Sequence, residues 1–271
     1  MAADNSAEAL TAQLDEVWSS LGELGASLTD KEWGLPTACP GWPVSAHYAH
    51  IIGTESTLLG RPSPGVDPGR PAHVRNDIGG FNEVWVAALT EVPRVEVMAR
   101  FAEVTDARRQ ALAAMDEDNF SEPSWTPVGQ ADYRRFMQIR VFDCWVHEQD
   151  VRTAVDRPGH TVGPVAEQAV DEVARALGYI VGKKAGAPEG SSVTFELTGP
   201  VSRHLHVVVD GRARVVDRLD GPPTVTVTLG SGPFTRLACG RVDPGAVLGD
   251  IRLSGDTNLG QRIVTSLPYT I

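Results

Sequence analysis

The sequence has few cysteines, no long apolar run and no excess of basic residues. Its three cysteines, Cys39, Cys144 and Cys239, are odd in number, lie far apart and form no C-x-x-C pair. This pattern excludes a disulfide scaffold or a zinc ribbon and is typical of a reducing compartment. No window approaches the ~18 consecutive apolar residues that a membrane span needs. The N-terminus also lacks the basic and apolar regions of a secretory signal, so we expect a cytoplasmic protein without a membrane partner.

Positive charge is scarce as well. Among 271 residues, 24 Lys and Arg stand against 35 Asp and Glu, which gives a formal net charge of −11. No stretch concentrates basic residues, so we expect no nucleic-acid partner. Apolar residues make up 42% of the chain, enough to bury a core, and this argues against disorder. The length suits one large domain or two small ones.

The first two thirds of the chain have helical patterning. Leucine and valine recur every three or four residues from Leu10 to Leu28, which predicts an amphipathic helix with one apolar face. The helices predicted in this way span residues 10–28, 43–59, 94–115 and 133–155. Proline and glycine mark the segments 60–72 and 123–129 as loops. Four helices joined by loops predict an up-and-down bundle.

The patterning changes across the glycine-rich segment Gly182–Gly190, which follows a further predicted helix over residues 165–181. Beyond this segment, apolar residues alternate or β-branched residues cluster, as in strands. The predicted strands span residues 192–197, 204–209, 212–217 and 224–229, and short helices are predicted over 234–239 and 258–267. We therefore expect a helical bundle over residues 1–185 and a small α+β domain over 190–271. Domain interfaces commonly host ligand pockets, so we expect the functional site in the cleft between them.

Four side chains on two of the predicted helices are candidate metal ligands. Asp143 and His147 lie four residues apart, and His47 and His50 lie three apart, so each pair shares a helix face. Facing helices of a bundle build metal sites, and two imidazoles with one carboxylate leave a fourth position open, as in catalytic zinc sites. The spacing alone also fits an ordinary i,i+4 pair and a hydrogen-bonded core histidine, which are common arrangements.

The cysteines are poor candidates for a nucleophile. Cys144 follows Asp143 on the same predicted helix and therefore points about 100° away from it. Cys39 lies in the loop before the second helix, where a small buried hydrophobe is its more ordinary role. The sequence also contains no G-x-S-x-G elbow and no phosphate-binding loop.

Two segments resemble the metal motifs of a known family. The first runs from Thr37-Ala-Cys-Pro-Gly-Trp-Pro to His50, and the second is Arg140-Val-Phe-Asp-Cys-Trp-Val-His-Glu-Gln-Asp150. Both are similar to the mycothiol-dependent maleylpyruvate isomerase family of the DinB-like superfamily. The likeness continues through residues 154–159 and into the C-terminal half. The resemblance implies a DinB-like four-helix bundle followed by a small α+β domain of the sterol-carrier-like type.

The resemblance also implies a ligand set. In this family a bundle metal, usually zinc, is held by two histidines and an acidic residue, and these positions fall on His50, Asp143 and His147. Asp143 is a departure, because the isomerase itself has glutamate there, but aspartate is still an oxygen ligand. His47 would then lie beside the ligands or have a structural role. The implied cofactors are Zn²⁺, or another divalent metal, and mycothiol as the thiol cosubstrate.

The implied activity is that of a zinc- and thiol-dependent isomerase or S-transferase. A thiol at the open position of a cation is deprotonated, and the thiolate attacks an electrophilic carbon of a small, acidic substrate. The resemblance suggests that an arginine of the second domain binds the acid groups, and we select Arg241, although a solvated surface arginine is an equal alternative. We expect a monomer or a homodimer.

Two other functions remain open at this stage. The chain can be a non-catalytic module that binds a small molecule or lipid and carries a structural metal. Metal-assisted hydrolysis is the third hypothesis, but it needs a general base beside the metal. Glu148 is a poor base because it lies about 100° off the face of His147.

Overall fold

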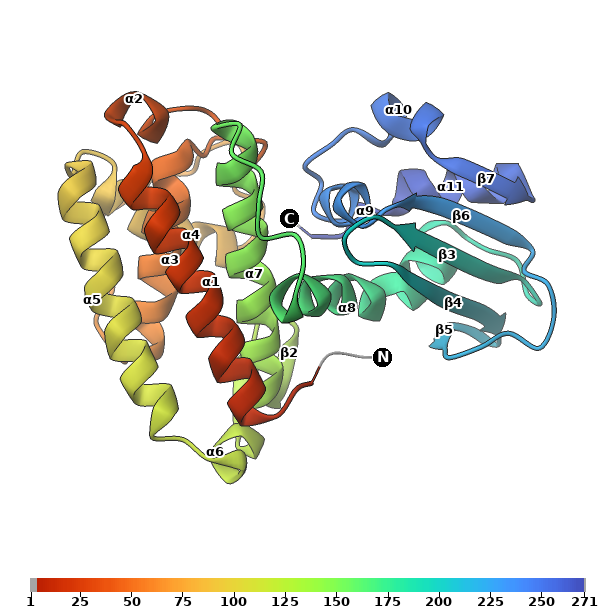
Figure 1. The fold of residues 1–271 in the computed structure, drawn as a ribbon, viewed down its shortest axis with the longest axis horizontal. Coiled ribbons are helices and arrows are strands. Elements are labelled where there is room, and N and C mark those ends of the chain that lie inside the picture. Colours follow the sequence, from red (N-terminus) through yellow and green to blue (C-terminus); the bar gives the residue numbers. More distant parts are fainter. Residues whose placement is uncertain (1–3, 271) are drawn as a thin grey trace. The chain divides into compact units, whose positions relative to one another are not determined.

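The computed structural model describes residues 4–270. These residues fold into two compact units (Figure 1). The first unit runs from Asp4 to His160, and the second begins at Thr161. No helix in the described part of the chain is both long enough and apolar enough to cross a membrane.

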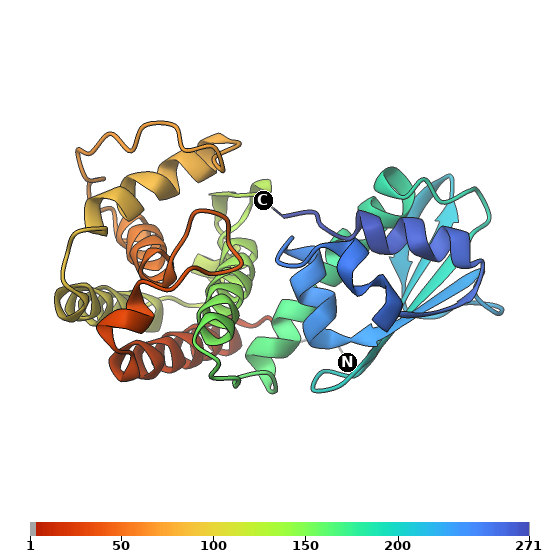
Figure 2. The ribbon, with the colours of Figure 1, turned by 90° about the horizontal axis from the view of Figure 1, so that it is seen from above.

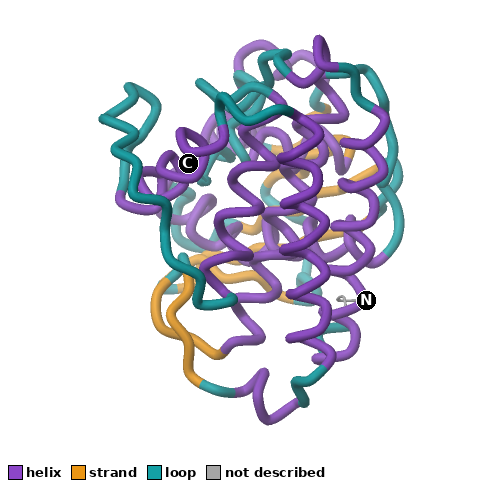
Figure 3. Tube along the Cα trace, turned by 90° about the vertical axis from the view of Figure 1, so that its left-hand side faces the viewer, coloured by secondary structure: helices purple, strands orange, loops and turns teal. Residues whose placement is uncertain are grey.

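The first unit is a bundle whose four long helices run side by side (Figures 1 and 3). They are α1 (Ala7–Ser27), α3 (Val44–Leu58), α5 (Arg94–Ala113) and α7 (Tyr133–Ala154). The predicted ranges agree with these helices to within a few residues. Helix α1 packs against α5 and α7, and α3 packs against the same two helices. The consecutive helices α1 and α3 therefore occupy opposite corners, unlike the neighbour-to-neighbour order of a simple up-and-down bundle.

The apolar pattern and the caps explain why these helices form where they do. The stripe predicted for the first helix is the buried face of α1. Its fully buried members are Leu10, Leu14, Val17 and Leu21. Helix α7 begins after Asp132, whose carboxylate accepts a hydrogen bond of 2.7 Å from the Arg135 N–H. Such a cap satisfies a backbone donor that has no partner within the helix.

A further helix, α4 (Asp77–Leu89), packs against α3 and was not predicted. Glycine disfavours helix, and Gly79-Gly80 lie in its first turn, so the propensity signal there is weak. The structure compensates with a cap, because Asn76 accepts a hydrogen bond of 2.8 Å from the Gly79 N–H. Gly53 of α3 permits close packing, since a Cβ there would lie 2.4 Å from Cγ of Trp85.

Short elements fill the connections of the bundle. Helix α2 (Asp30–Trp33) follows α1, and α6 (Glu117–Ser121) follows α5. The predicted loop over residues 123–129 is instead part of a hairpin of β1 (Pro123–Thr126) and β2 (Gly129–Asp132). Each strand has four residues, too few for a clear alternating pattern.

The second unit contains a five-stranded sheet with the order β5-β4-β3-β6-β7. Its strands are β3 (Ser192–Thr198), β4 (Arg203–Asp210), β5 (Arg212–Val216), β6 (Val225–Gly230) and β7 (Arg252–Gly255). Strands β3 and β6 pair in parallel, and the other neighbours are antiparallel. Strand β7 was not predicted, because it is short and mostly exposed.

Helices cover this sheet (Figure 2). They are α8 (Pro164–Gly178), α9 (Ser231–Ala238) and α11 (Thr257–Ser266), and the short α10 (Pro244–Val247) lies between the last two in the chain. Strands β3 and β6 contact α9, and β6 and β7 contact α11. The unit thus has the α+β composition predicted from the change in periodicity.

The division between the units falls earlier than the predicted boundary. Helix α8, which the sequence pattern grouped with the bundle, packs against β4, β5 and α9 of the second unit. It continues as a π-helical turn over Tyr179–Lys184. A Cβ at Gly178 would lie 2.9 Å from the Ala213 carbonyl oxygen, so helix and strand are in close contact there. An amphipathic pattern shows that a helix has an apolar face, but not which neighbour covers it.

Candidate metal centre

Helices α3 and α7 bring His50, Asp143 and His147 together. His50 Nε2 lies 2.9 Å from Asp143 Oδ2, and His147 Nε2 lies 3.5 Å from Asp143 Oδ1. The three side chains can each offer one ligand atom, and these atoms lie within 4.8 Å of one another. Both histidines are buried, whereas the Asp143 side chain is 29% exposed. Asp143 is therefore the side of the cluster nearest to solvent.

The electrostatics around the cluster suit a cation. Burial alone would raise the pKa of Asp143, but His50, Arg140 and His147 outweigh it and hold that pKa well below its usual value. Burial lowers the pKa of His50 despite the nearby Asp143 carboxylate, which favours a neutral ring with a lone pair. A carboxylate and a neutral imidazole are the forms that coordinate a metal.

The pKa of His147 shifts in the opposite direction from that of His50. Burial alone would lower its pKa, but the carboxylates of Asp143 and Asp150 outweigh burial and raise it. The two carboxylates that favour a proton on this ring also favour a metal cation beside it. Two imidazoles and one carboxylate form a donor set that Zn²⁺ accepts, and three protein ligands leave one tetrahedral position for water or substrate. The residues present therefore fit the metal that the sequence motif implies.

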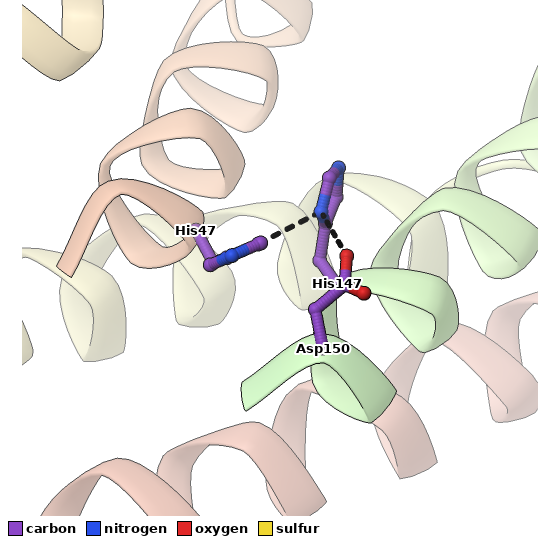
Figure 4. Close-up of side chains that lie close together, drawn as sticks. All are labelled: His47, His147 and Asp150. Carbon is purple, nitrogen blue, oxygen red and sulfur yellow. Dashed lines mark hydrogen bonds and ion pairs between the residues drawn. The ribbon is translucent and has the colours of Figure 1, made fainter. Parts of the chain in front are cut away.

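A second group of three shares His147 (Figure 4). His47 Nδ1, from α3, lies 2.9 Å from His147 Nδ1, and Asp150 Oδ2 lies 3.6 Å from the same nitrogen. All three side chains are buried. The two groups thus meet opposite nitrogens of one ring, since Asp143 faces Nε2 whereas His47 and Asp150 face Nδ1.

Trp42 packs against the imidazoles. Its ring centroid lies 5.6 Å from that of His47, 5.3 Å from that of His50 and 5.5 Å from that of His147. The indole N–H donates a hydrogen bond of 2.6 Å to Glu83 of α4, which fixes the ring. Helix α4 therefore supports the cluster, and sequence reasoning missed both this helix and Glu83.

A buried chain of charges extends from Asp143. Arg140 donates to Asp143 Oδ2 and, at 2.6 Å, to Glu55 Oε1. The other Glu55 oxygen accepts a hydrogen bond of 2.8 Å from Arg108 Nε. Glu55 and Arg108 are 0% and 1% exposed. Sequence reasoning missed this network, although Glu55 lies five residues after His50 and Arg140 lies three before Asp143.

The cysteines have the surroundings of structural side chains. Cys144 is fully buried with its sulfur 3.3 Å from the Arg140 guanidinium. Burial raises the pKa of the Cys144 thiol to about 12, so it is un-ionised at neutral pH. Cys239 is also buried, and Cys39 is half-buried in the segment before α3.

Two further residues were singled out in the sequence, Arg241 and Glu148. Arg241 belongs to the second unit, directly after α9, where its guanidinium donates to the Cys239 carbonyl at 2.9 Å and is half-buried. Glu148 is fully buried and accepts hydrogen bonds from Ser20 and Arg152. These contacts turn Glu148 toward Ser20 and Arg152 and away from the candidate metal ligands.

The sequence matches two family models that together cover most of the chain. Residues 4–152 match the mycothiol maleylpyruvate isomerase N-terminal domain, and residues 167–262 match the C-terminal domain of the same family. The chain belongs to the mycothiol-dependent maleylpyruvate isomerase family. This confirms the family expected from the two motifs, and each match lies within one of the two units.

Two solved structures of the isomerase have a similar fold. The crystal structure of the mycothiol-dependent maleylpyruvate isomerase aligns over 87% of this chain and 90% of its own, with 18% identity and a TM-score of 0.56. A histidine-to-alanine mutant of that isomerase aligns over the same shares, with 17% identity and the same TM-score. A ubiquinone synthesis protein with an SCP2 domain aligns over 36% of this chain and 91% of its own, with 17% identity and a TM-score of 0.29. A search of curated proteins finds no match.

Proposed function

We propose that this protein is a zinc- and thiol-dependent isomerase or S-transferase that uses mycothiol and acts on a small electrophilic, acidic substrate. The observation that carries the proposal is the buried cluster of His50, Asp143 and His147 in a chain of this family. The related solved proteins are isomerases by name. Among candidate substrates, maleylpyruvate is the first to test.

The cation and the protein have separate tasks in this proposal. When bound, the cation supplies the positive charge that deprotonates a thiol at neutral pH. His50, Asp143 and His147 hold that cation, and Arg140 fixes the Asp143 carboxylate by donating to its Oδ2. Trp42 packs against the rings of His50 and His147. A thiolate is the nucleophilic form, and no cysteine of the chain is needed to supply it.

We also propose that Arg241 binds the acid groups of the substrate. A guanidinium presents paired N–H donors that match a carboxylate, which a lysine ammonium does not reproduce. Arg241→Lys is therefore expected to raise KM for a dicarboxylic substrate while kcat changes less. An unchanged KM would show that Arg241 does not bind these acid groups, and another arginine would be the next candidate.

The decisive experiment combines metal analysis with turnover. Purified protein is expected to contain one divalent metal and to convert maleylpyruvate to its trans isomer only when mycothiol is added. A panel of other electrophiles, assayed for thioether product, separates the transferase from the isomerase. Asp143→Asn keeps the shape of the ligand but removes its charge, so metal content and turnover should both fall.

Glu23→Gln, at an exposed position of α1, is the matched control and should change neither quantity. Turnover that persists in metal-free Asp143→Asn would overturn the metal-dependent mechanism. Stoichiometric metal in wild-type protein without any thiol binding would favour a binding module instead.

A further inference from the structure

We infer that Thr37 and His47 form a hydrogen-bond chain that sets the tautomer and the ring orientation of His147. In this role they are positioning residues for a metal ligand and are not ligands themselves. The inference rests on the proposed function, because it concerns the same centre. It also decides which of the two groups that share His147 holds the metal.

The hydrogen-bond chain starts at the hydroxyl of Thr37, which precedes α3. Thr37 Oγ1 lies 2.8 Å from the Trp42 carbonyl oxygen. A carbonyl only accepts hydrogen bonds, so the single hydroxyl proton is directed there. The Cys39 N–H donates to the same Oγ1 at 3.1 Å. Toward any other neighbour, Thr37 Oγ1 is therefore an acceptor.

That other neighbour is His47. Its Nε2 lies 2.9 Å from Thr37 Oγ1, so Nε2 carries a proton and donates it. A neutral imidazole protonated at Nε2 has a lone pair at Nδ1. His47 Nδ1 lies 2.9 Å from His147 Nδ1. Two nitrogens at this distance share one proton, and it must come from His147.

His147 is thereby protonated at Nδ1, which directs the lone pair at Nε2 toward Asp143. Asp150 Oδ2 lies 3.6 Å from the same Nδ1, longer than a normal hydrogen bond, so His47 is the nearer acceptor. Metal-bound histidines usually donate their second N–H to a carboxylate, carbonyl or water, which orients the ring. Here an imidazole has that function, and its own proton is placed by a threonine hydroxyl.

The assignment excludes His47 as a ligand. Its Nε2 is engaged with Thr37 and its Nδ1 with His147, so binding a metal would break one of these hydrogen bonds. The group of His47, His147 and Asp150 is thus the support of the metal centre. His50, Asp143 and His147 remain as the ligands.

The test uses the full-length protein labelled with ¹⁵N-histidine. Long-range ¹H–¹⁵N spectra distinguish the two tautomers of each ring, and the His47→Asn variant assigns the His47 signals among the seven histidines. In wild-type protein, His47 is expected as the Nε2–H tautomer and zinc-loaded His147 as the Nδ1–H tautomer. The opposite tautomer at His47 would overturn the inference.

Two substitutions test the consequence for zinc affinity, measured by chelator competition. Thr37→Val removes the hydroxyl at constant shape and is expected to weaken zinc binding about tenfold or more, as loss of an outer hydrogen bond typically does. Thr37→Ser keeps the hydroxyl and should restore wild-type affinity. Equal affinity in Thr37→Val and wild-type protein would contradict the inference.

These results separate the inference from the proposed function. If wild-type protein binds zinc through His50 and Thr37→Val binds it equally well, only the hydrogen-bond chain is wrong. If wild-type protein binds no metal, the proposed function fails, and the tautomer of His47 in metal-free protein still tests the chain. That spectrum does not require Thr37→Val, so this test remains valid even if Thr37→Val folds poorly.

Discussion

At the scale of single residues, charges of alternating sign connect the core of the bundle to the candidate metal ligands. Arg108, Glu55, Arg140 and Asp143 follow one another through ion pairs. Burying a charge is costly, and the partner charge offsets this cost only if the geometry is good. The series of ion pairs therefore makes Asp143 dependent on residues that are not candidate metal ligands themselves.

Glu55→Gln is expected to destabilise the protein strongly, because it leaves Arg108 buried without a carboxylate and leaves Arg140 with Asp143 alone. Breaking a buried ion pair costs about 3–5 kcal/mol of unfolding free energy, which urea unfolding measures. The matched control is Glu103→Gln, which removes an exposed carboxylate paired with Arg61. Its loss should be much smaller, and equal losses would contradict the account.

The candidate ligands were predictable from sequence, but their supports were not. His50, Asp143 and His147 stand in motifs with helical spacing, and the structure brings them together. Glu55 and Arg108 carry no such signal, because a buried charge on a helix looks like any surface charge until its partner is known. Glu83 was missed for a further reason, since its helix itself was not predicted.

At the scale of elements, long helices with a regular apolar stripe were predictable and short or glycine-containing elements were not. Helix α1 buries every member of its stripe, whereas α4 begins with Gly79-Gly80 and β7 has only four residues. Helix α8 was predicted as an element but grouped with the wrong neighbours. Tertiary contacts decide whether such elements form and what they pack against, and local sequence patterns do not reveal these contacts.

Two glycine substitutions should change stability in opposite directions. Gly53→Ala places a Cβ against Trp85 and is expected to cost about 1–3 kcal/mol through overpacking between α3 and α4. Gly80→Ala, on α4, meets open space and should stabilise that helix by about 0.5–1 kcal/mol. Thermal and urea unfolding test both. Stabilisation by Gly53→Ala would disprove the close contact.

The segment between α7 and α8 is held to the bundle by a pH-dependent contact. His160 has a positive φ of 52°, and its Nδ1 lies 2.6 Å from Glu148 Oε2, while Nε2 lies 3.3 Å from Glu16 Oε1. Arg152 also binds Glu148. Burial alone would lower the pKa of His160, but the two carboxylates outweigh it and raise this pKa above 6.5.

His160→Asn is therefore expected to cost most stability at low pH. A raised pKa in the folded state stabilises the fold fully below the unfolded value of about 6.5 and loses this effect as the pH rises through the folded pKa. The difference in unfolding free energy between wild type and variant should thus be largest near pH 6 and shrink by pH 9. A difference that grows with pH would show that His160 is bound as a neutral ring.

At the scale of the whole molecule, the two units divide the proposed tasks. The three candidate metal ligands lie in the unit Asp4–His160, and Arg241 lies in the other. The family match covers both units, so the predicted fold class is confirmed, with a helical N-terminal domain and a sheet-containing C-terminal domain. Metal binding is thus expected to depend on the first unit and substrate affinity on both.

A variant without cysteine is expected to keep thiol-dependent turnover. Cys144 and Cys239 are buried, and the thiol of Cys144 is un-ionised at neutral pH. In the proposed mechanism the nucleophile is the added thiol. The measurement compares kcat of wild-type protein with that of a variant in which Cys39, Cys144 and Cys239 are all alanine. Loss of turnover in a folded variant would point to a cysteine of the chain as the nucleophile.

The central claim is that a cation bound by His50, Asp143 and His147 activates an external thiol. The most direct test is mycothiol-dependent turnover of wild-type protein before chelation, after verified removal of the metal, and after re-addition of zinc. Turnover is expected to disappear with the metal and to return with it. Full turnover in protein shown to contain no metal would contradict the claim.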